Sequence, residues 1–335
     1  MRKPRPLYVY AALSAALFLG LIGLPLVIES RYLLHIVIMT GMYTALALSY
    51  DLAVGHVGLV SLAHPSFFGV GAYLAAILST RFGTPFLVNF VLGGIVAAGV
   101  AFLLSFPFLR LEAGSFAIGT LGLALIVKLV AINEVWLTRG WDCIIGVPRP
   151  RLALGPLLDW QVSSLTDYYY LMLGILLVVV ALCSRLTTSR LGRTLISIRE
   201  DETLAKASGV DPRKYKTLAF TVGALVAGSV GAFYVQYASL ICPSEVSEYM
   251  TTALLIILFL GGVGRMRGVI LGGVIFTFVP ELLRIAPTWR MVIYGLLLLV
   301  GIVFAPDGLD GILTKWLRRL PFAGTGATSH ENQQG

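Results

Sequence analysis

Charged residues are scarce in this chain of 335 residues: Asp, Glu, Lys and Arg together make up 13% of it. Soluble domains usually contain about 25%, whereas 57% of this chain is hydrophobic and its mean hydropathy is +0.87. A chain this apolar needs lipid as its solvent. The net charge of +8 does not indicate a nucleic-acid partner, because the basic residues are scattered over short connectors. The composition therefore predicts a membrane protein.

Cysteine is also rare, with three residues at Cys143, Cys183 and Cys242. Three cysteines make neither a disulfide framework nor a metal cluster, so we expect no metal site. Cys183 lies in an apolar run and reads as a small core residue. Cys143 and Cys242 fall in connectors that we assign below to the outer side, where an oxidising periplasm would allow a disulfide. The sequence leaves open whether they pair.

A glycine directly before a lysine, which a phosphate-binding P-loop requires, does not occur in the sequence. The six lysines follow Arg, Val, Ala, Arg, Tyr and Thr. We therefore expect no cofactor in this chain and no ATPase activity. The energy for any active transport would come from a partner subunit that binds ATP and Mg²⁺, or from an ion gradient.

Long apolar runs are what the sequence has in abundance. A spanning helix needs about 20 predominantly apolar residues. The two runs at 249–264 and 268–283 are short and rich in glycine, so they are either full spans or a re-entrant pair. The sequence predicts an all-α bundle of eight to ten transmembrane helices, with candidate spans at 7–28, 32–50, 57–80, 85–109, 113–133, 168–186, 217–239, 249–264, 268–283 and 291–306.

The distribution of Lys and Arg predicts the orientation. If the N-terminus is cytoplasmic and the spans alternate, 17 basic residues face the inside and 7 face the outside. The positive-inside rule then places both termini in the cytoplasm of a multi-pass protein of the bacterial inner membrane. The first run is too long for a cleaved signal peptide. We divide the chain into a permease-like membrane domain over 1–320, with an outer connector at 134–167 and an inner connector at 187–216, and a disordered tail at 321–335.

The inner connector is the most basic stretch of the chain and contains signals for a short helix. Asp201 is a good N-cap and Glu202 suits a first helical turn. Gly209 is suited to the position directly after the end of a helix, and Pro212 follows three residues later. On residue physics alone this helix is either a force-transmitting element that a partner grips or a simple connector.

Polar residues inside the apolar runs are few, and each calls for an explanation. Asp51 and Glu281 lie near predicted span ends, where interfacial water would solvate them, and Lys128 could extend to the interface. His64 is expected to be a hydrogen-bonded residue in a kinked helix or part of a translocation path. Ser61 lies three residues before His64, but no orienting acid accompanies the two, which disfavours a membrane hydrolase.

Small residues recur at helical spacing in two places. Gly264, Gly268 and Gly272 form one series, and Ala224, Gly228 and Ala232 form another. Such faces let helix backbones approach closely. Packing within one bundle is the simpler interpretation, and contact with a second subunit is the other.

Four ordered stretches resemble one protein family, the permease subunits of branched-chain amino acid ABC transporters, and specifically the second of their two permeases. The resemblance extends from about residue 40 to 310. The first stretch is LVSLAHPSFFGVGAY at 59–73. The second extends over 192–220, with IREDE at 198–202, YK at 215–216 and LAF at 218–220. The third extends over 257–268, with GGVG at 261–264 and RG at 267–268, and the fourth is YGL at 294–296 leading to FAPDGL at 304–309.

The resemblance implies a role and a set of partners. The chain would carry branched-chain amino acids through the membrane together with a homologous permease, two cytoplasmic ATPase subunits and a periplasmic binding protein, without being an enzyme itself. Urea, short amides and other small carboxylates are alternative solutes. An ion-coupled carrier is a rival function, although Asp51 and Glu281 are poor ion sites at span edges.

The resemblance also implies residue roles. The helix near Asp201 corresponds to the coupling helix that docks into the ATPase, but at the family's Glu-Ala-Ala pattern this chain has Thr203, Leu204 and Ala205, followed by the expected Gly209. The outer connector departs from the family at Trp141 and Cys143. Candidate docking residues are Arg199, Glu200, Asp201, Glu202, Ala205 and Gly209, and candidate residues of the translocation path are Ser61, His64, Phe67 and Lys128.

Overall fold

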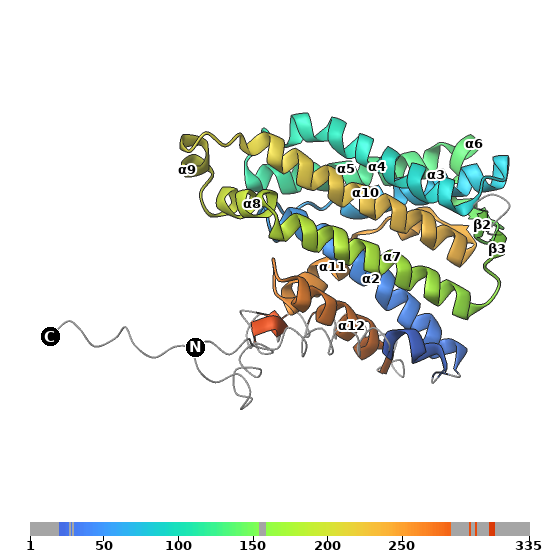
Figure 1. Ribbon diagram of the computed structural model, residues 1–335. Coiled ribbons are helices and arrows are strands. Elements are labelled where there is room, and N and C mark those ends of the chain that lie inside the picture. The colour runs from blue at the N-terminus through green and yellow to red at the C-terminus, as the bar shows by residue number, and fades with distance from the viewer. Residues whose placement is uncertain are drawn as a thin grey trace, which may run out of the picture.

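The structure is a computed structural model that describes residues 20–26, 28, 30–153, 159–282, 295, 299 and 308–311. It confirms the predicted all-α fold: the helices of the bundle run side by side (Figure 1). Among the described residues, six helices are long and apolar enough to cross a membrane. The main helices, including the shorter α11 and α12, are α2 (Arg31–Val54), α3 (His64–Phe82), α4 (Phe86–Phe108), α5 (Ala113–Asn133), α7 (Leu165–Thr188), α10 (Pro212–Ala238), α11 (Glu248–Gly261) and α12 (Met266–Leu282).

The predicted spans agree with these helices to within a few residues, with one exception. The run at 57–80 becomes helical only at His64, because residues 55–63 form two turns joined by an irregular segment. Ser61 therefore precedes the helix, and the expectation that Ser61 and His64 lie three apart on one helix was wrong. Most of the runs at 7–28 and 291–306 and the tail at 321–335 lie outside the described residues. The total of eight to ten spans stays a prediction.

Helix α10 is the centre of the bundle and packs against α2, α3 and α4. Its crossing with α3 is close: a Cβ atom added to Gly71 would overlap the carbonyl group of Gly228. Ala224 and Ala232 of the same series are fully buried in this chain. The glycine series Gly264, Gly268 and Gly272 also packs within the bundle, since a Cβ on Gly268 would overlap Gly261 of α11. These contacts confirm packing within one bundle for both series.

The α11–α12 pair is short. With 14 residues, α11 is about 21 Å long, which is less than the roughly 30 Å of a bilayer core. Together with the preceding turn η3 (Pro243–Glu245), the segment Pro243–Gly261 is long enough to cross. The turn at Gly262–Arg265 connects the two helices on the side of the bundle where α2 ends.

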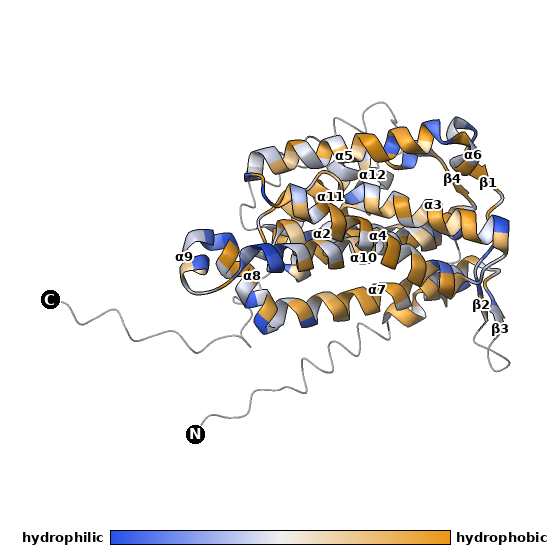
Figure 2. Cartoon of the chain, turned by 90° about the horizontal axis from the view of Figure 1, so that it is seen from above, coloured by the Kyte–Doolittle hydropathy of each residue, from blue (hydrophilic) through white to orange (hydrophobic). Residues whose placement is uncertain are grey.

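The two ends of the bundle differ in character. One end, which we call the basic end, is formed by α8 (Arg190–Glu200) and α9 (Glu202–Ala207). Many of its residues are hydrophilic and are drawn in blue in Figure 2. The opposite end has α6 (Val135–Thr138), η1 (Gly140–Asp142) and two short sheets (Figure 1). A disulfide joins Cys143 to Cys242 there, so we call it the disulfide end. Its antiparallel strand pairs are β1 (Ile144–Ile145) with β4 (Leu240–Ile241), and β2 (Arg151–Ala153) with β3 (Asp159–Gln161).

Candidate functional site

The inner connector contains two helices instead of one. Helix α8 begins after Ser189, whose hydroxyl accepts a hydrogen bond from the Leu191 N–H. It buries Gly192, Leu195 and Ile198, which recur every three residues and so lie on one face. This spacing was a readable signal, but the sequence analysis placed the helical part only after Asp201. The helix lies against the end of the bundle at an angle to α7 (Figure 1).

Helix α9 forms as its capping residues predict. The Asp201 carboxylate accepts hydrogen bonds from the N–H groups of Thr203, at 2.8 Å, and Leu204, at 2.9 Å. Ala205 is buried on the inner side of this helix. Gly209 follows the helix end with φ of +82°, a backbone conformation that favours glycine. The short helix predicted from Asp201 to Gly209 is confirmed, whereas its docking role is not tested by the fold.

An ion-pair cluster ties α9 to α10. Glu202 Oε2 lies 2.6 Å from the Lys216 ammonium, and Glu202 Oε1 lies 3.0 Å from that of Lys206. The hydrogen bond from Lys216 is the main cause that lowers the pKa of the Glu202 carboxyl. Lys216 is largely buried and occupies the second turn of α10, so this ion pair joins α9 to the central helix.

Arg199 points into the protein from the end of α8. Its guanidinium donates a hydrogen bond to the carbonyl oxygen of Gly55, at the end of α2. The aliphatic part of its side chain lies against Gly58, where an added Cβ would come within 3.2 Å. Sequence reasoning grouped Arg199 with the ATPase-docking residues. The structure shows that Arg199 keeps an exposed surface but also contacts the end of α2, whereas the neighbouring Glu200 is simply exposed.

A buried carboxylate lies beside this contact. Asp51 is only 3% exposed, and its Oδ1 accepts a hydrogen bond of 2.8 Å from the Gly264 N–H in the α11–α12 turn. Its Oδ2 lies 3.6 Å from His56 Nδ1. The expectation that interfacial water solvates Asp51 was wrong, because protein groups surround it. We call Asp51, Gly55, His56, Arg199 and Gly264 the inner node, since they join α2, α8 and the α11–α12 turn.

The core around His64 is closed and hydrogen-bonded. His64 Nε2 lies 2.9 Å from the Ser49 hydroxyl, and the residue is 3% exposed. The Ser61 hydroxyl accepts from the Ala63 N–H at 3.3 Å, and the Ser61 carbonyl accepts from Tyr50 at 2.7 Å. These bonds fix the turn that starts α3, and they give Ser61 no bond to His64 that would activate a nucleophile.

The other two candidate path residues are placed separately. Phe67 is buried, with its ring edge-on to His64 and to Phe220 of α10. Lys128 is half-buried on α5, a helix with many exposed apolar side chains, including Ile118, Ile126 and Leu129. The structure thus brings Ser61, His64 and Phe67 together in one core, and Lys128 lies on a different helix. Sequence reasoning missed the inner node, because its members are distant in the chain.

Comparisons with known proteins identify the family. The family described as "Branched-chain amino acid transport system / permease component" matches residues 32–302. The high-affinity branched-chain amino acid transport system permease protein LivM of Escherichia coli K12 is 31% identical over 301 residues, which are 84% of this chain and 70% of the relative. LivM of Salmonella typhimurium is 32% identical over the same shares. LivH of Escherichia coli K12 is 23% identical over 80% of this chain and 91% of the relative.

No solved protein structure matches the chain significantly. The family match covers most of the chain, including the inner node, α8 and α9, and it agrees with the multi-pass helical fold. The resemblance seen in the sequence is confirmed. This chain belongs to the family of branched-chain amino acid transport system permeases.

Proposed function

We propose that this chain is the membrane subunit of an ATP-driven importer of branched-chain amino acids in the bacterial inner membrane. A homologous permease would pair with it, two cytoplasmic ATPases would drive it, and a periplasmic binding protein would deliver the solute. The names of the LivM and LivH relatives support the solute and the second permease. The lack of a Gly–Lys step supports ATP hydrolysis by other subunits.

Two independent features support the orientation. The basic residues concentrate on the side of α8 and α9, as expected for a cytoplasmic face. The disulfide of Cys143 with Cys242 lies at the other end, as expected for a face in the oxidising periplasm. With this orientation, α9 faces the cytoplasmic ATPases.

The observation that carries the proposal is the way α9 is built. The Leu204 side chain is 65% exposed, and it is the one large apolar residue of this helix. Ala205 on the same helix is buried against the bundle. Leu204 would insert into the ATPase groove. When the ATPases close, they would push α9, and the Glu202–Lys216 pair would carry the push to α10. Arg199 would carry the same movement to the end of α2 through Gly55.

Reconstituted vesicles test this proposal. Complete assemblies with ATP inside and loaded binding protein outside should accumulate leucine, and they should continue to do so with an uncoupler present. Leu204→Glu should abolish uptake and release the ATPases from the membrane during purification. Leu240→Glu changes a partly exposed leucine at the disulfide end and should do neither.

The same vesicles separate the rivals. Uptake that persists without ATPase subunits, or that an uncoupler abolishes at constant ATP, would replace the proposal with an ion-coupled carrier. Unlabelled urea, short amides or other small carboxylates could compete with the labelled solute for uptake while isoleucine and valine do not. That result would leave the ATP-driven mechanism in place and identify a different solute.

A further inference from the structure

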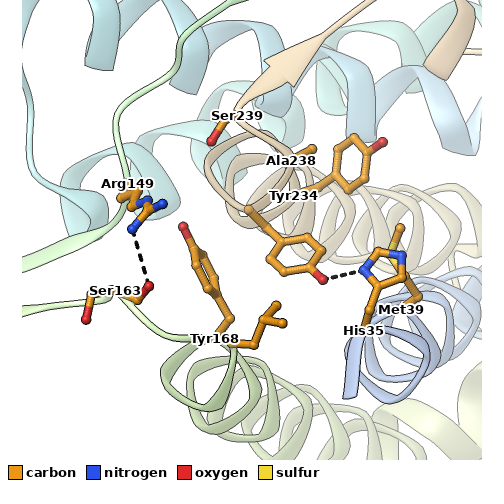
Figure 3. A pocket seen from close by; sticks show the side chains of 10 residues that line it. His35, Met39, Arg149, Ser163, Tyr168, Tyr234, Ala238 and Ser239 are labelled. Carbon is orange, nitrogen blue, oxygen red and sulfur yellow. Dashed lines mark hydrogen bonds between the residues drawn. The ribbon is translucent and has the colours of Figure 1, made fainter. Parts of the chain in front are cut away.

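A cavity of about 420 Å³ opens at the disulfide end, between α2, α7, α10 and the outer connector (Figure 3). Its volume lies within the range of roughly 300–1,000 Å³ that is usual for small-molecule sites. Arg149 and Ser163 form the wall on the connector side, and His35 and Met39 of α2 form the opposite wall. Tyr168 lies between them.

The aromatic wall of the cavity is held in place by its own hydrogen bonds. The Tyr168 hydroxyl donates to the Gln236 carbonyl oxygen at 3.1 Å, and the Tyr237 hydroxyl lies 2.5 Å from His35 Nδ1. The rings of Tyr168 and Tyr237 meet edge to face with centroids 5.0 Å apart. These hydroxyls are therefore committed to the protein, and the ring surfaces are the rigid part of the cavity.

Arg149 is different, because it is exposed and the described residues accept one hydrogen bond from it. Its Nη1 donates to the Ser163 carbonyl oxygen at 3.3 Å, whereas a guanidinium has five N–H donors. Of the described residues that line the cavity, it alone carries a permanent charge. The site therefore combines one cation with free donors, a fixed aromatic wall, and apolar surface from Met39 and Leu165.

We propose that this cavity binds a free α-amino acid after the binding protein releases it. This proposal rests on the proposed function. The Arg149 guanidinium pairs with the α-carboxylate through two parallel hydrogen bonds. The α-ammonium lies on the face of a tyrosine ring, where a cation is attracted electrostatically. The aliphatic side chain packs against Met39 and Leu165. Arg149 is thus the residue that selects for the carboxylate.

Transport by the complete assembly gives the first test. Arg149→Gln should lower leucine uptake by about 10- to 100-fold, which corresponds to one lost charged hydrogen-bonded pair. Arg149→Lys keeps the charge and should retain part of the activity. Ala238→Phe fills the cavity without a change of charge and should block uptake as strongly as Arg149→Gln. Arg151→Gln removes a charge two residues away, outside the cavity lining, and should transport normally.

Direct binding gives the second test and needs no binding protein. Saturation-transfer NMR of the assembly in nanodiscs should detect leucine with the unmodified protein and lose it with Arg149→Gln. Leucinamide, which lacks the carboxylate, should give a weak signal with both proteins.

The outcomes separate the two proposals. If Arg149→Gln prevents the binding protein from stimulating the ATPases while Ala238→Phe transports normally, Arg149 is a contact for the binding protein and the cavity proposal is wrong. Equal NMR signals for leucine and leucinamide would also overturn it. If unmodified assemblies take up no leucine at all, the proposed function fails instead.

Discussion

Replacing Asp51 tests whether the inner node holds the basic end together. In Asp51→Ala, the buried Gly264 N–H loses its acceptor, and His56 and Arg199 lose the carboxylate that they face. An unsatisfied buried donor costs about 1–3 kcal/mol, and removal of one member of a buried ion pair costs about 3–5 kcal/mol. Because Arg199 is partly solvated, we expect a total loss of about 3–5 kcal/mol. Asp51→Asn keeps the acceptor for Gly264 and should lose about 1–2 kcal/mol.

The assay is the apparent thermal midpoint of the purified protein in detergent, compared at one heating rate. The expected losses correspond to a decrease of about 10 °C for Asp51→Ala and about 4 °C for Asp51→Asn. Glu200→Gln removes an exposed carboxylate from the same end and should leave the midpoint unchanged. Midpoints equal to that of the unmodified protein, or equal decreases for both Asp51 variants, would refute the account of the Gly264 bond.

Three further predictions concern other contacts. The pKa of Glu202 is lowered in the folded protein, so its contact with Lys216 stabilises α9 fully above the usual carboxyl pKa, and this stabilisation is lost as the pH falls from that value through the lowered pKa. In Lys216→Met, a fluorescent label on α9 should therefore become mobile at a higher pH than in the unmodified protein. Reduction of the Cys143–Cys242 disulfide, which closes a loop of 99 residues, should cost about 2–4 kcal/mol and lower the thermal midpoint, whereas unchanged melting would show that the cysteines are not paired. Gly228→Leu should prevent α10 from packing on Gly93 and Ala97 of α4 and abolish the folded fraction in gel filtration. Gly99→Leu, which has open space for a Cβ, is the control.

The sequence was most informative where a local rule decides the structure. Helices α4 and α5 end within a few residues of the predicted spans, because a lipid-facing helix must be apolar over its whole length. The caps of α9 were also predictable, since Asp201 and Gly209 act on backbone groups only a few residues away. Local chemistry is contained in the order of the residues and needs no knowledge of the fold.

The sequence was least informative where the structure depends on distant partners. Asp51 lies near a span end in the sequence, so solvation by interfacial water was the natural expectation. Its partner Gly264 is 213 residues away, and no local pattern connects the two. Arg199 looked like one charge in a solvated connector, yet it bonds to Gly55 at a separation of 144 residues. The cavity near Arg149 likewise arises only when three helices and the outer connector meet.

Helices α2 and α10 both run from the basic end of the bundle to the cavity at the disulfide end. Helix α2 carries His35 and Met39 at the cavity and Asp51 at the node. Helix α10 begins near Lys216, which holds α9, and ends at Tyr237 in the cavity wall. Since helices in a close-packed bundle move as rigid units, we expect a displacement of α9 to be transmitted along α10 to the cavity wall. A contact with an ATPase could therefore regulate access for an amino acid at the far side of the membrane, although the two sites share no residue.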